Sequence, residues 1–313
     1  MAFEPGLDLM SWEPLEWVDH HFGWGWSALW DRSNRIWVVG RGDWGTEIYY
    51  YDIVADKWVL IPRWLPWGVV SGHDCTICFN RNKIYCTRGD GGAEFAEFDL
   101  NTWTITSLAS LPWGVHHGSS IVHTCSALHP AGNDDHIYVI RGWDSNHFAR
   151  YSISANAWTD LSTTQPLPFT PWEGCSSAIW TYGFNPDRIY VFRFRDTGEM
   201  AYYTISTGAW TTFTPSPPVS WFYRGDATYN EGHYIYINAG HDVWWRGIWR
   251  LDLRDNTIRP ATPRYMCFMG EFAYGRRVVY VRVRGRPYLY IYPGGWRRAC
   301  FMRVLLLPEM MGV

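Results

Sequence analysis

Arginine and aspartate recur together along the chain and are the residues best suited to hold a charged ligand. In most copies the arginine ends an apolar segment, and the aspartate follows two or three residues later. The arginines are Arg41, Arg88, Arg141, Arg193 and Arg282, and the aspartates are Asp43, Asp90, Asp144, Asp196 and Asp242, with Ala239 in place of the fifth arginine. Guanidinium groups pair with carboxylates and stack on aromatic rings. We expect these residues to form salt bridges within or between repeats; the alternative is an arginine ring that faces a ligand.

Tryptophan and histidine recur in a second set of segments. Pro-Trp-Gly or Pro-Trp-Glu-Gly sequences contain Trp67, Trp113 and Trp172, and His116 and His117 follow the second of them. Exposed tryptophan rings would form a stacking surface for sugars or for a protein partner, whereas packing between repeats would bury them. Adjacent histidines on extended chain point apart, so a metal site would need ligands from several repeats. We therefore predict candidate binding residues here and no metal site.

Sequence signatures of catalysis are absent. The chain contains no G-x-S-x-G, no P-loop and no H-E-x-x-H, and no pair of acidic residues has a spacing that suggests glycoside hydrolysis. We therefore predict no catalytic residue and no cofactor.

The elements that must position these residues are short strands, because one fragment occurs six times. Each copy has an apolar strand, an aromatic-Asp strand and, in most copies, a tryptophan five to seven residues later that we expect to be structural. The apolar strands begin near residues 37, 84, 137, 189, 235 and 278, and the tryptophans are Trp58, Trp103, Trp158, Trp210 and Trp296. Repeats of roughly 50 residues made of strands and turns are typical of propeller blades, which bury both faces only by packing on neighbours.

A small apolar strand precedes each of these fragments and completes a four-stranded unit. The sequence therefore predicts a single all-β domain over residues 1–313, a six-bladed β-propeller with four-stranded antiparallel blades. The blades are expected over 25–302, with an N-terminal strap at 1–24 and an apolar tail at 303–313. Residues 12–17 resemble the opening of a fourth strand, so we expect the N-terminus to complete the last blade and close the ring. A strand from Trp296 competes for that position.

The order of motifs resembles that of the kelch-repeat propellers. The matching residues run Trp103, Leu111-Pro112, Ser119 onward, Ile137-Tyr138, Arg141-Gly142, Tyr151 and Trp158. The resemblance covers about residues 25–300, clear in the first four copies and degenerate in the last two. It implies that the turns between second and third strands share a face with the loops that join blades. Arg-Gly stands where the family has a glycine pair, so the resemblance transfers no ligand site.

The cysteines predict thiols rather than a disulfide framework. The chain has seven of them, an odd number without compact spacing, in or beside predicted strands. Cys75 and Cys78 form a C-x-x-C, but residues three apart on a strand point to opposite faces. We therefore expect reduced, buried thiols, without redox or metal chemistry at this pair.

Charge is unevenly distributed. Residues 243–303 carry a net charge of +10, whereas residues 1–20 contain five acids and no lysine or arginine, within a chain of net charge −3. We expect the acidic strap to pair with the basic last blade; the rival is a basic patch that faces nucleic acid or an acidic partner. The acidic N-terminus predicts no signal peptide and therefore synthesis in the cytoplasm, and no apolar run is long enough to predict a membrane span.

Together these patterns predict a non-enzymatic scaffold that binds protein partners within a larger assembly, such as a virion or phage particle. The first alternative is a glycan-binding propeller that uses the loop tryptophans and arginines. The second is a small-molecule enzyme at the channel mouth, which a deep pocket lined by His116, His117 and Arg141 would support.

Overall fold

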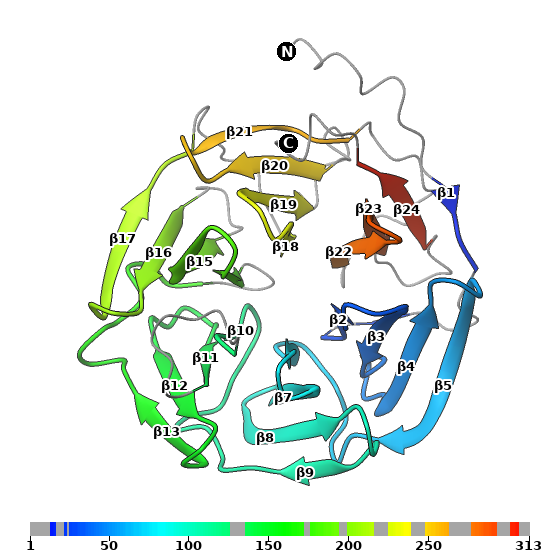
Figure 1. Cartoon of the computed structure of the whole chain (residues 1–313). Helices are drawn as coiled ribbons and strands as arrows, with labels where there is room; N and C mark the ends of the chain where they lie inside the picture. Colours follow the sequence, from blue (N-terminus) through cyan, green and yellow to red (C-terminus); the bar gives the residue numbers. More distant parts are fainter. Residues whose placement is uncertain are drawn as a thin grey trace.

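The structure confirms an all-β, six-bladed propeller. It is a computed structural model that describes residues 13–16, 22–23, 25–125, 135–171, 176–193, 199–215, 225–238, 248–262, 277–292 and 301–306. These segments form 24 strands in six four-stranded antiparallel sheets around a central axis (Figure 1). All regular elements among them are strands, so the described part of the chain offers no helix that could cross a membrane.

Consecutive strands build the first five blades, each from the axis outward. Blade one contains β2 (Ser27–Trp30), β3 (Arg35–Val39), β4 (Glu47–Asp52) and β5 (Lys57–Trp64). Blade two contains β6 (Asp74–Cys78), β7 (Lys83–Gly89), β8 (Gly92–Asp99) and β9 (Ile105–Ser107). Blade three contains β10 (Ser120–His123), β11 (His136–Ile140), β12 (Phe148–Ser152) and β13 (Ala157–Asp160). Blade four contains β14 (Ser176–Thr181), β15 (Asn185–Arg193), β16 (Met200–Thr204) and β17 (Ala209–Phe213). Blade five contains β18 (Asp226–Tyr229), β19 (Tyr234–Asn238), β20 (Ile248–Asp252) and β21 (Thr257–Pro260).

Blade six is built from both ends of the chain, as predicted. Its strands are β22 (Arg277–Val283), β23 (Arg286–Tyr292), β24 (Met302–Leu305) and the N-terminal β1 (Glu13–Pro14). β1 pairs antiparallel with β24, with Glu13 opposite Arg303. Two guanidinium nitrogens of Arg303 donate to the Glu13 carboxylate at 2.7 and 2.9 Å. The acidic strap and the basic last blade therefore meet in an ion pair at the closure.

The strand assignment within blade six requires a correction. The segment from Val278 was expected to be a second strand, but β22 is the innermost strand of its sheet. Residues 302–305, placed at the start of an apolar tail, form the third strand. The last blade takes its fourth strand from the N-terminus, so each of its C-terminal segments lies one place nearer the axis than the repeat suggested. Trp296 lies outside the described residues.

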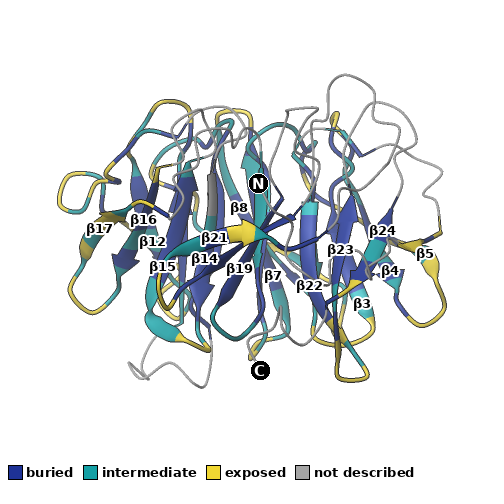
Figure 2. Cartoon of the chain, turned by 90° about the horizontal axis from the view of Figure 1, so that it is seen from above, coloured by how far each residue is buried: buried dark blue, intermediate teal, exposed yellow. Residues whose placement is uncertain are grey.

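The hydrophobic core is divided into six clusters, and each cluster lies between two neighbouring blades. Between blades two and three, for example, Tyr85 and Phe95 pack with Ile137 and Tyr151. Figure 2 shows the buried residues along the strands and the exposed ones mainly at turns and outer strands. No described blade has a core of its own, so the stability of each blade depends on its two neighbours.

A tyrosine, an asparagine and a tryptophan fasten blade three to blade two. The Tyr151 hydroxyl donates to Asn156 Oδ1 at 2.7 Å, and the same oxygen accepts the backbone N–H of Ala109 at 2.9 Å. The Trp158 indole donates to the Ala109 carbonyl at 2.8 Å. Blade one repeats the arrangement with Tyr51, Asp56, Glu16 and Trp58, and in blade four Tyr203 and Trp210 both bind Gln165. These tryptophans therefore make structural contacts between blades.

Trp103 occupies a different position from the other tryptophans. It follows the aromatic residue of its strand by five residues rather than seven, which places it in the turn before the fourth strand. Its φ of 58° matches that of the corresponding turn residues Asp56, Asn156, Gly208 and Asn256. The ring packs against the core between blades one and two. The variable spacing in the sequence thus marks two distinct structural positions.

The expectation of reduced cysteines is wrong for one pair. Cys75 on β6 and Cys86 on β7 lie opposite each other and form a disulfide, with their Cα atoms 4.3 Å apart. Cys78 and Cys125 are buried free thiols, as expected. Cys75 belongs to the core between blades one and two, and Cys78 to the core between blades two and three. The two cysteines of the C-x-x-C therefore point to opposite faces of blade two, as predicted.

Candidate functional site

The upper face is defined here as the face that carries the blade-joining loops and the turns between second and third strands. Four of the predicted arginines, Arg41, Arg88, Arg141 and Arg193, lie at the upper ends of second strands. Three of them form ion pairs with a glutamate six residues later, on the far side of the turn. The pairs are Arg41–Glu47, Arg88–Glu94 and Arg193–Glu199.

Arg141 has a different set of partners. It donates through Nε to the Gly114 carbonyl at 3.1 Å, and its guanidinium lies 3.4 Å from His147 Nδ1. His147 occupies the position that glutamate has in the other three turns. The arginines therefore pair within their own hairpins or with the neighbouring loop, and glutamate takes the place of the predicted aspartate in the described ion pairs.

The aspartates after the arginines shape the turns. Asp43, Asp90 and Asp144 each have a φ of 50°. In blade one the turn residues Asp43 and Trp44 lie between the bridged residues Gly42 and Gly45, and both have positive φ. Two consecutive residues with positive φ define a type I′ hairpin turn, which favours aspartate, asparagine and glycine. Asp196 and Asp242 lie outside the described residues.

Arg282 does not belong to the arginine ring, which is a correction that follows from the shifted strands of blade six. It lies near the lower end of the inner strand β22, and its Nε donates to the Tyr280 hydroxyl at 3.0 Å. The hydrogen bond to Tyr280 stabilises the charged guanidinium more than burial destabilises it, so the pKa of Arg282 is raised above its usual range. Arg282 therefore lies toward the opposite face from the other four arginines.

Among the described residues, the Pro-Trp-Gly tryptophans are buried or half-buried, whereas other tryptophans of the upper face are exposed. Trp67 is buried at 8% exposure, Trp113 is half-buried, and Trp172 lies outside the described residues. Trp44 and Trp143, in the turns of blades one and three, are exposed by 61% and 52%. Both have positive φ, 68° and 50°, which is rare for a large residue. Together with Trp64 at the end of β5, which is exposed by 56%, they are the exposed tryptophans among the described residues of this face.

Histidines accompany the tryptophan of blade three. The ring centroids of His116 and His117 lie 5.5 and 5.3 Å from that of Trp143. Burial, together with the positive charge of Arg141, lowers the pKa of His116. The sequence analysis placed these two histidines near Arg141, and the structure adds Trp143 to the group.

A pocket of about 310 Å³ lies between blades one and two. Trp67 and Arg88, two predicted binding residues, line it together with Glu94 and Phe95. Glu94 already pairs with Arg88, so the polar wall of this pocket is neutral overall.

The axial channel is lined by the six inner strands and has a volume of about 200 Å³. Ser27, Asp74, Ser120 and Asp226 begin four of these strands and, together with Arg277, form a polar ring; the side chains of these four bond to neighbouring inner strands. Ser27 Oγ accepts the Cys75 N–H at 3.0 Å, and Asp226 Oδ2 accepts the Val278 N–H at 2.9 Å. Because inner strands of different blades do not pair through a ladder, these bonds link the blades at the axis.

Two carboxylates and one guanidinium dominate the charge of this ring. Burial, partly offset by Arg277, raises the pKa of Asp226 to about 6 and also raises that of Asp74. Arg277 Nε donates to the Trp26 carbonyl at 2.8 Å, which ties blade six to blade one. The ring is therefore an interior site with proton-binding capacity.

Arg32 reaches across the lower end of the channel. From the turn after β2 its guanidinium lies 3.9 Å from the Phe79 ring centroid of blade two and 4.9 Å from the Tyr182 centroid of blade four. It also pairs with Glu231 of blade five at 2.9 Å. One side chain thus connects four blades. The channel lining contains inner-strand residues and neither His116, His117 nor Arg141.

No protein-family model matches the chain, and a search of curated proteins finds no relative. The propeller architecture is established by the structure, whereas the kelch resemblance rests on the sequence motifs alone.

Sequence reasoning missed Trp44 and Trp143, as well as Asp74, Asp226 and Arg277. Trp44 directly follows Arg-Gly-Asp, so its place in a turn could have been read from the repeat. The charged residues of the channel begin inner strands, and the alignment of those first residues across blades was the available signal.

Proposed function

We propose that this chain is a non-enzymatic scaffold that binds a protein partner through its upper face. The observation that carries the proposal is the exposure of Trp44 and Trp143 in left-handed backbone conformations. A large residue held in this region costs about 1–3 kcal/mol, and it persists only where the surroundings or a function require it. Both residues remain more than half exposed, so packing within the chain buries only part of each side chain.

The surroundings of these rings suit a protein interface. Tryptophan and arginine are the residues most enriched at the energetic centres of protein–protein contacts. Arg41 lies in the same hairpin as Trp44, and Arg141 in the same hairpin as Trp143. The Arg41–Glu47 pair and the Arg141–Gly114 hydrogen bond orient the guanidinium groups before a partner arrives. Pre-ordered side chains lose less entropy on binding.

The six cores between blades support the role of a rigid platform. Tight hairpin turns on such a frame present their side chains in fixed positions. We infer that the partner belongs to a larger assembly, for which a virion or phage particle is the example that the sequence suggested. Native mass spectrometry of the complex from its natural source would identify the partner.

The test is a double variant, Trp44→Gly with Trp143→Asn. Glycine recreates at position 44 the Asp-Gly turn of blade two, where Gly91 has a φ of 76°, and asparagine tolerates positive φ. The double variant is expected to lose the partner while its melting temperature stays equal or rises. Val54→Ser, which removes an apolar side chain exposed by 59% in the turn after β4, is the matched control and should retain the partner.

Two results would contradict the proposal. One is a double variant that captures the partner as well as the wild type does. The other is a wild-type chain that remains monomeric and recovers no structural partner from its source.

A glycan is the second candidate ligand, and the group formed by Trp143, His116 and His117 favours it. An aromatic ring beside polar side chains can stack on a sugar face and bind its hydroxyls. A glycan array with the wild type and with Trp113→Ala and Trp143→Ala variants distinguishes the two ligands. Binding that depends on Trp143 would replace the protein partner by a sugar.

A further inference from the structure

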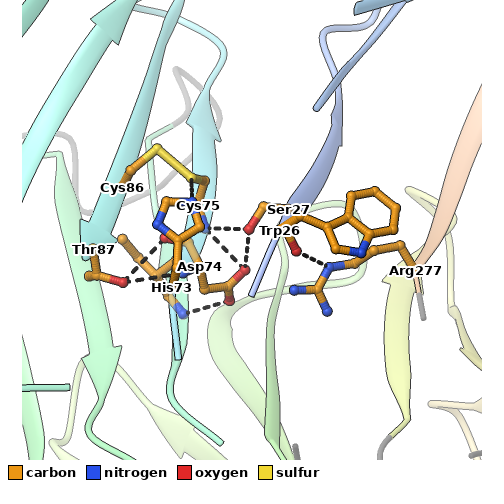
Figure 3. Close-up of a disulfide and its surroundings, with 9 residues drawn as sticks. Trp26, Ser27, His73, Asp74, Cys75, Cys86, Thr87 and Arg277 are labelled. Atoms are coloured by element: carbon orange, nitrogen blue, oxygen red, sulfur yellow. Dashed lines mark hydrogen bonds between the residues drawn. A yellow bond between two sulfur atoms is a disulfide. The ribbon is translucent and has the colours of Figure 1, made fainter. Parts of the chain in front are cut away.

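Blade two carries a second kind of chemistry, buried in the core between blades one and two. His73, Cys75 and Cys86 converge there, and Figure 3 shows the histidine ring beside the disulfide. His73 Nε2 lies 3.2 Å from Cys75 Sγ. The imidazole nitrogen and the two sulfurs all lie within 4.8 Å of one another.

The strand register explains this convergence. Cys75 and Cys86 are directly opposite each other on β6 and β7, so their side chains emerge on the same side of the sheet. His73 lies directly before β6, and its Nε2 lies 3.2 Å from Cys75 Sγ, on the same side as the two sulfurs. β6 and β7 thus supply the two sulfurs, and the residue before β6 supplies the imidazole.

The ligand types select a soft or borderline cation. Thiolate sulfur and neutral imidazole are the preferred ligands of Zn²⁺, at about 2.3 and 2.0–2.1 Å. His73 is buried at 2% exposure and its Nε2 lies 3.2 Å from Cys75 Sγ, so the imidazole can offer a nitrogen lone pair to a metal beside the two sulfurs. A Zn²⁺ ion with two thiolates and one neutral imidazole has no net charge. The apolar core around Cys75 and Cys86 can therefore enclose it without burying an uncompensated charge.

We propose that reduction of the Cys75–Cys86 disulfide turns this cluster into a Zn²⁺ site with His73 as the third ligand. A dithiol reductant supplies two electrons and two protons; the S–S bond breaks, two thiols form, and the reductant becomes a cyclic disulfide. Zn²⁺ then displaces the two thiol protons to solvent. Reoxidation returns two electrons to an oxidised dithiol, re-forms the S–S bond and releases the ion.

An entry path leads from the axial channel. Cys75 lies on the inner strand β6 and lines the channel, so an ion or a reductant can approach from the axis. The proposed site would link the inner strand of blade two to its second strand in both redox states, by a covalent bond when oxidised and by a metal when reduced.

The other group of potential ligands is less suitable. Cys78, Cys125 and Asp135 also lie within 4.8 Å of one another. However, Asp135 Oδ2 accepts a hydrogen bond from Arg81 Nε at 2.8 Å, and Asn80 Nδ2 lies 3.2 Å from the same oxygen. A guanidinium at that carboxylate already neutralises it and repels a second cation. Cys78 and Cys125 therefore serve as the internal control.

The test compares the full-length chain before and after treatment with dithiothreitol. Each sample is incubated with Zn²⁺, desalted and analysed for bound metal, with Co²⁺ as a spectroscopic probe of thiolate ligation. We expect about one equivalent of zinc in the reduced wild type and in Cys78→Ser/Cys125→Ser, and none in the oxidised wild type. Cys86→Ser should lose the ion, and His73→Gln should weaken binding at least about tenfold.

A second measurement needs no variant that might misfold. Zinc should protect Cys75 and Cys86 of the reduced wild type from alkylation, read by peptide mass spectrometry, while Cys78 and Cys125 keep the same rate with and without metal. The proposal is overturned if the reduced wild type holds no zinc, if oxidation leaves the zinc in place, or if protection appears at Cys78 and Cys125 instead.

Discussion

Replacement of Asp226 by asparagine probes the polar ring that joins the inner strands of the channel. The carboxylate accepts the backbone N–H of Val278 at 2.9 Å, and an asparagine oxygen can keep this hydrogen bond. Burial is the main cause of the raised pKa of Asp226, and Arg277 only partly offsets it. The variant therefore removes the titration and leaves the packing nearly unchanged.

The sign of the effect follows from the direction of the shift. The pKa of Asp226 rises from an ordinary 3.8 to about 6 on folding, so the folded chain binds the proton more tightly than the unfolded chain. The stabilisation is fully present below pH 3.8 and is lost as the pH rises through about 6. A shift of that size corresponds to at most about 3 kcal/mol, since each unit is worth about 1.4 kcal/mol. The Asp226 side chain lines the channel and is only partly buried, so solvent screening reduces this value.

The assay is urea denaturation followed by tryptophan fluorescence at several pH values from below 3 to 7.5. The stability of Asp226→Asn relative to the wild type should be near zero at pH 4 and should rise by up to about 3 kcal/mol at pH 7. The quantity to compare is the stability of the variant minus that of the wild type at each pH. Buried His73 and His123, whose pKa values are lowered to about 3, change stability with pH in the opposite direction, but equally in both proteins, so their contribution cancels in this difference.

Asp252→Asn is the control of opposite sign. Burial opposes ionisation of Asp252, but hydrogen bonds from Arg254 outweigh it and hold the pKa below its usual value. That variant should be less stable than the wild type at pH 7, with a difference that shrinks as the pH falls below 3.8. A pH-independent difference for Asp226→Asn, or a loss of stability that grows with pH, would refute the buried, proton-binding ring.

Two further predictions concern the contacts between blades. Asn156→Ala removes the hydrogen-bond acceptor for Tyr151 and Ala109 and places alanine at a φ of 48°, so it should lower the free energy of unfolding by about 2–3 kcal/mol. Asn156→Gly loses the same acceptor without the backbone strain, so its loss should be about 1 kcal/mol smaller. Equal losses for the two variants in urea denaturation would argue against a role of backbone strain. A double-mutant cycle with Glu13→Ala and Arg303→Ala should give a coupling energy of no more than about 1 kcal/mol, because the Glu13 side chain is 55% exposed. A coupling energy several times larger would mean that the ion pair, rather than strand pairing, closes the ring.

Most of the fold could be predicted from the sequence. The recurring Ile-Tyr and aromatic-Asp strands located the second and third strands of blades one to four, and the spacing of the copies predicted the number of blades. The resemblance of residues 12–17 to the opening of a fourth strand predicted that the N-terminus completes blade six. These features follow from local pattern, because every blade must bury the same two faces.

The strand order of blade six and the residues of the candidate site could not be predicted from local sequence patterns. The run from Val278 reads equally well as a first or a second strand, and only the pairing with β23 and β24 decides between them. The disulfide required the register that places Cys75 opposite Cys86, which a sequence spacing of eleven residues does not reveal. The exposure of a tryptophan depends on which way a turn projects, so the Pro-Trp-Gly segments and the hairpin turns could not be distinguished in advance.

The three tryptophans with positive φ differ in how far their side chains are buried. Trp44, Trp103 and Trp143 share a backbone conformation that disfavours large residues. The ring of Trp103 packs against the core between blades one and two, and its carbonyl accepts Arg63 Nε at 3.0 Å, so tertiary contacts offset its strain. Trp44 and Trp143 have the same strain, with rings more than half exposed. Since blade two forms an equivalent turn with Gly91 at the position of Trp44, the fold itself does not require a tryptophan there. Under the proposed function, a partner that covers the upper face would bury these two side chains further.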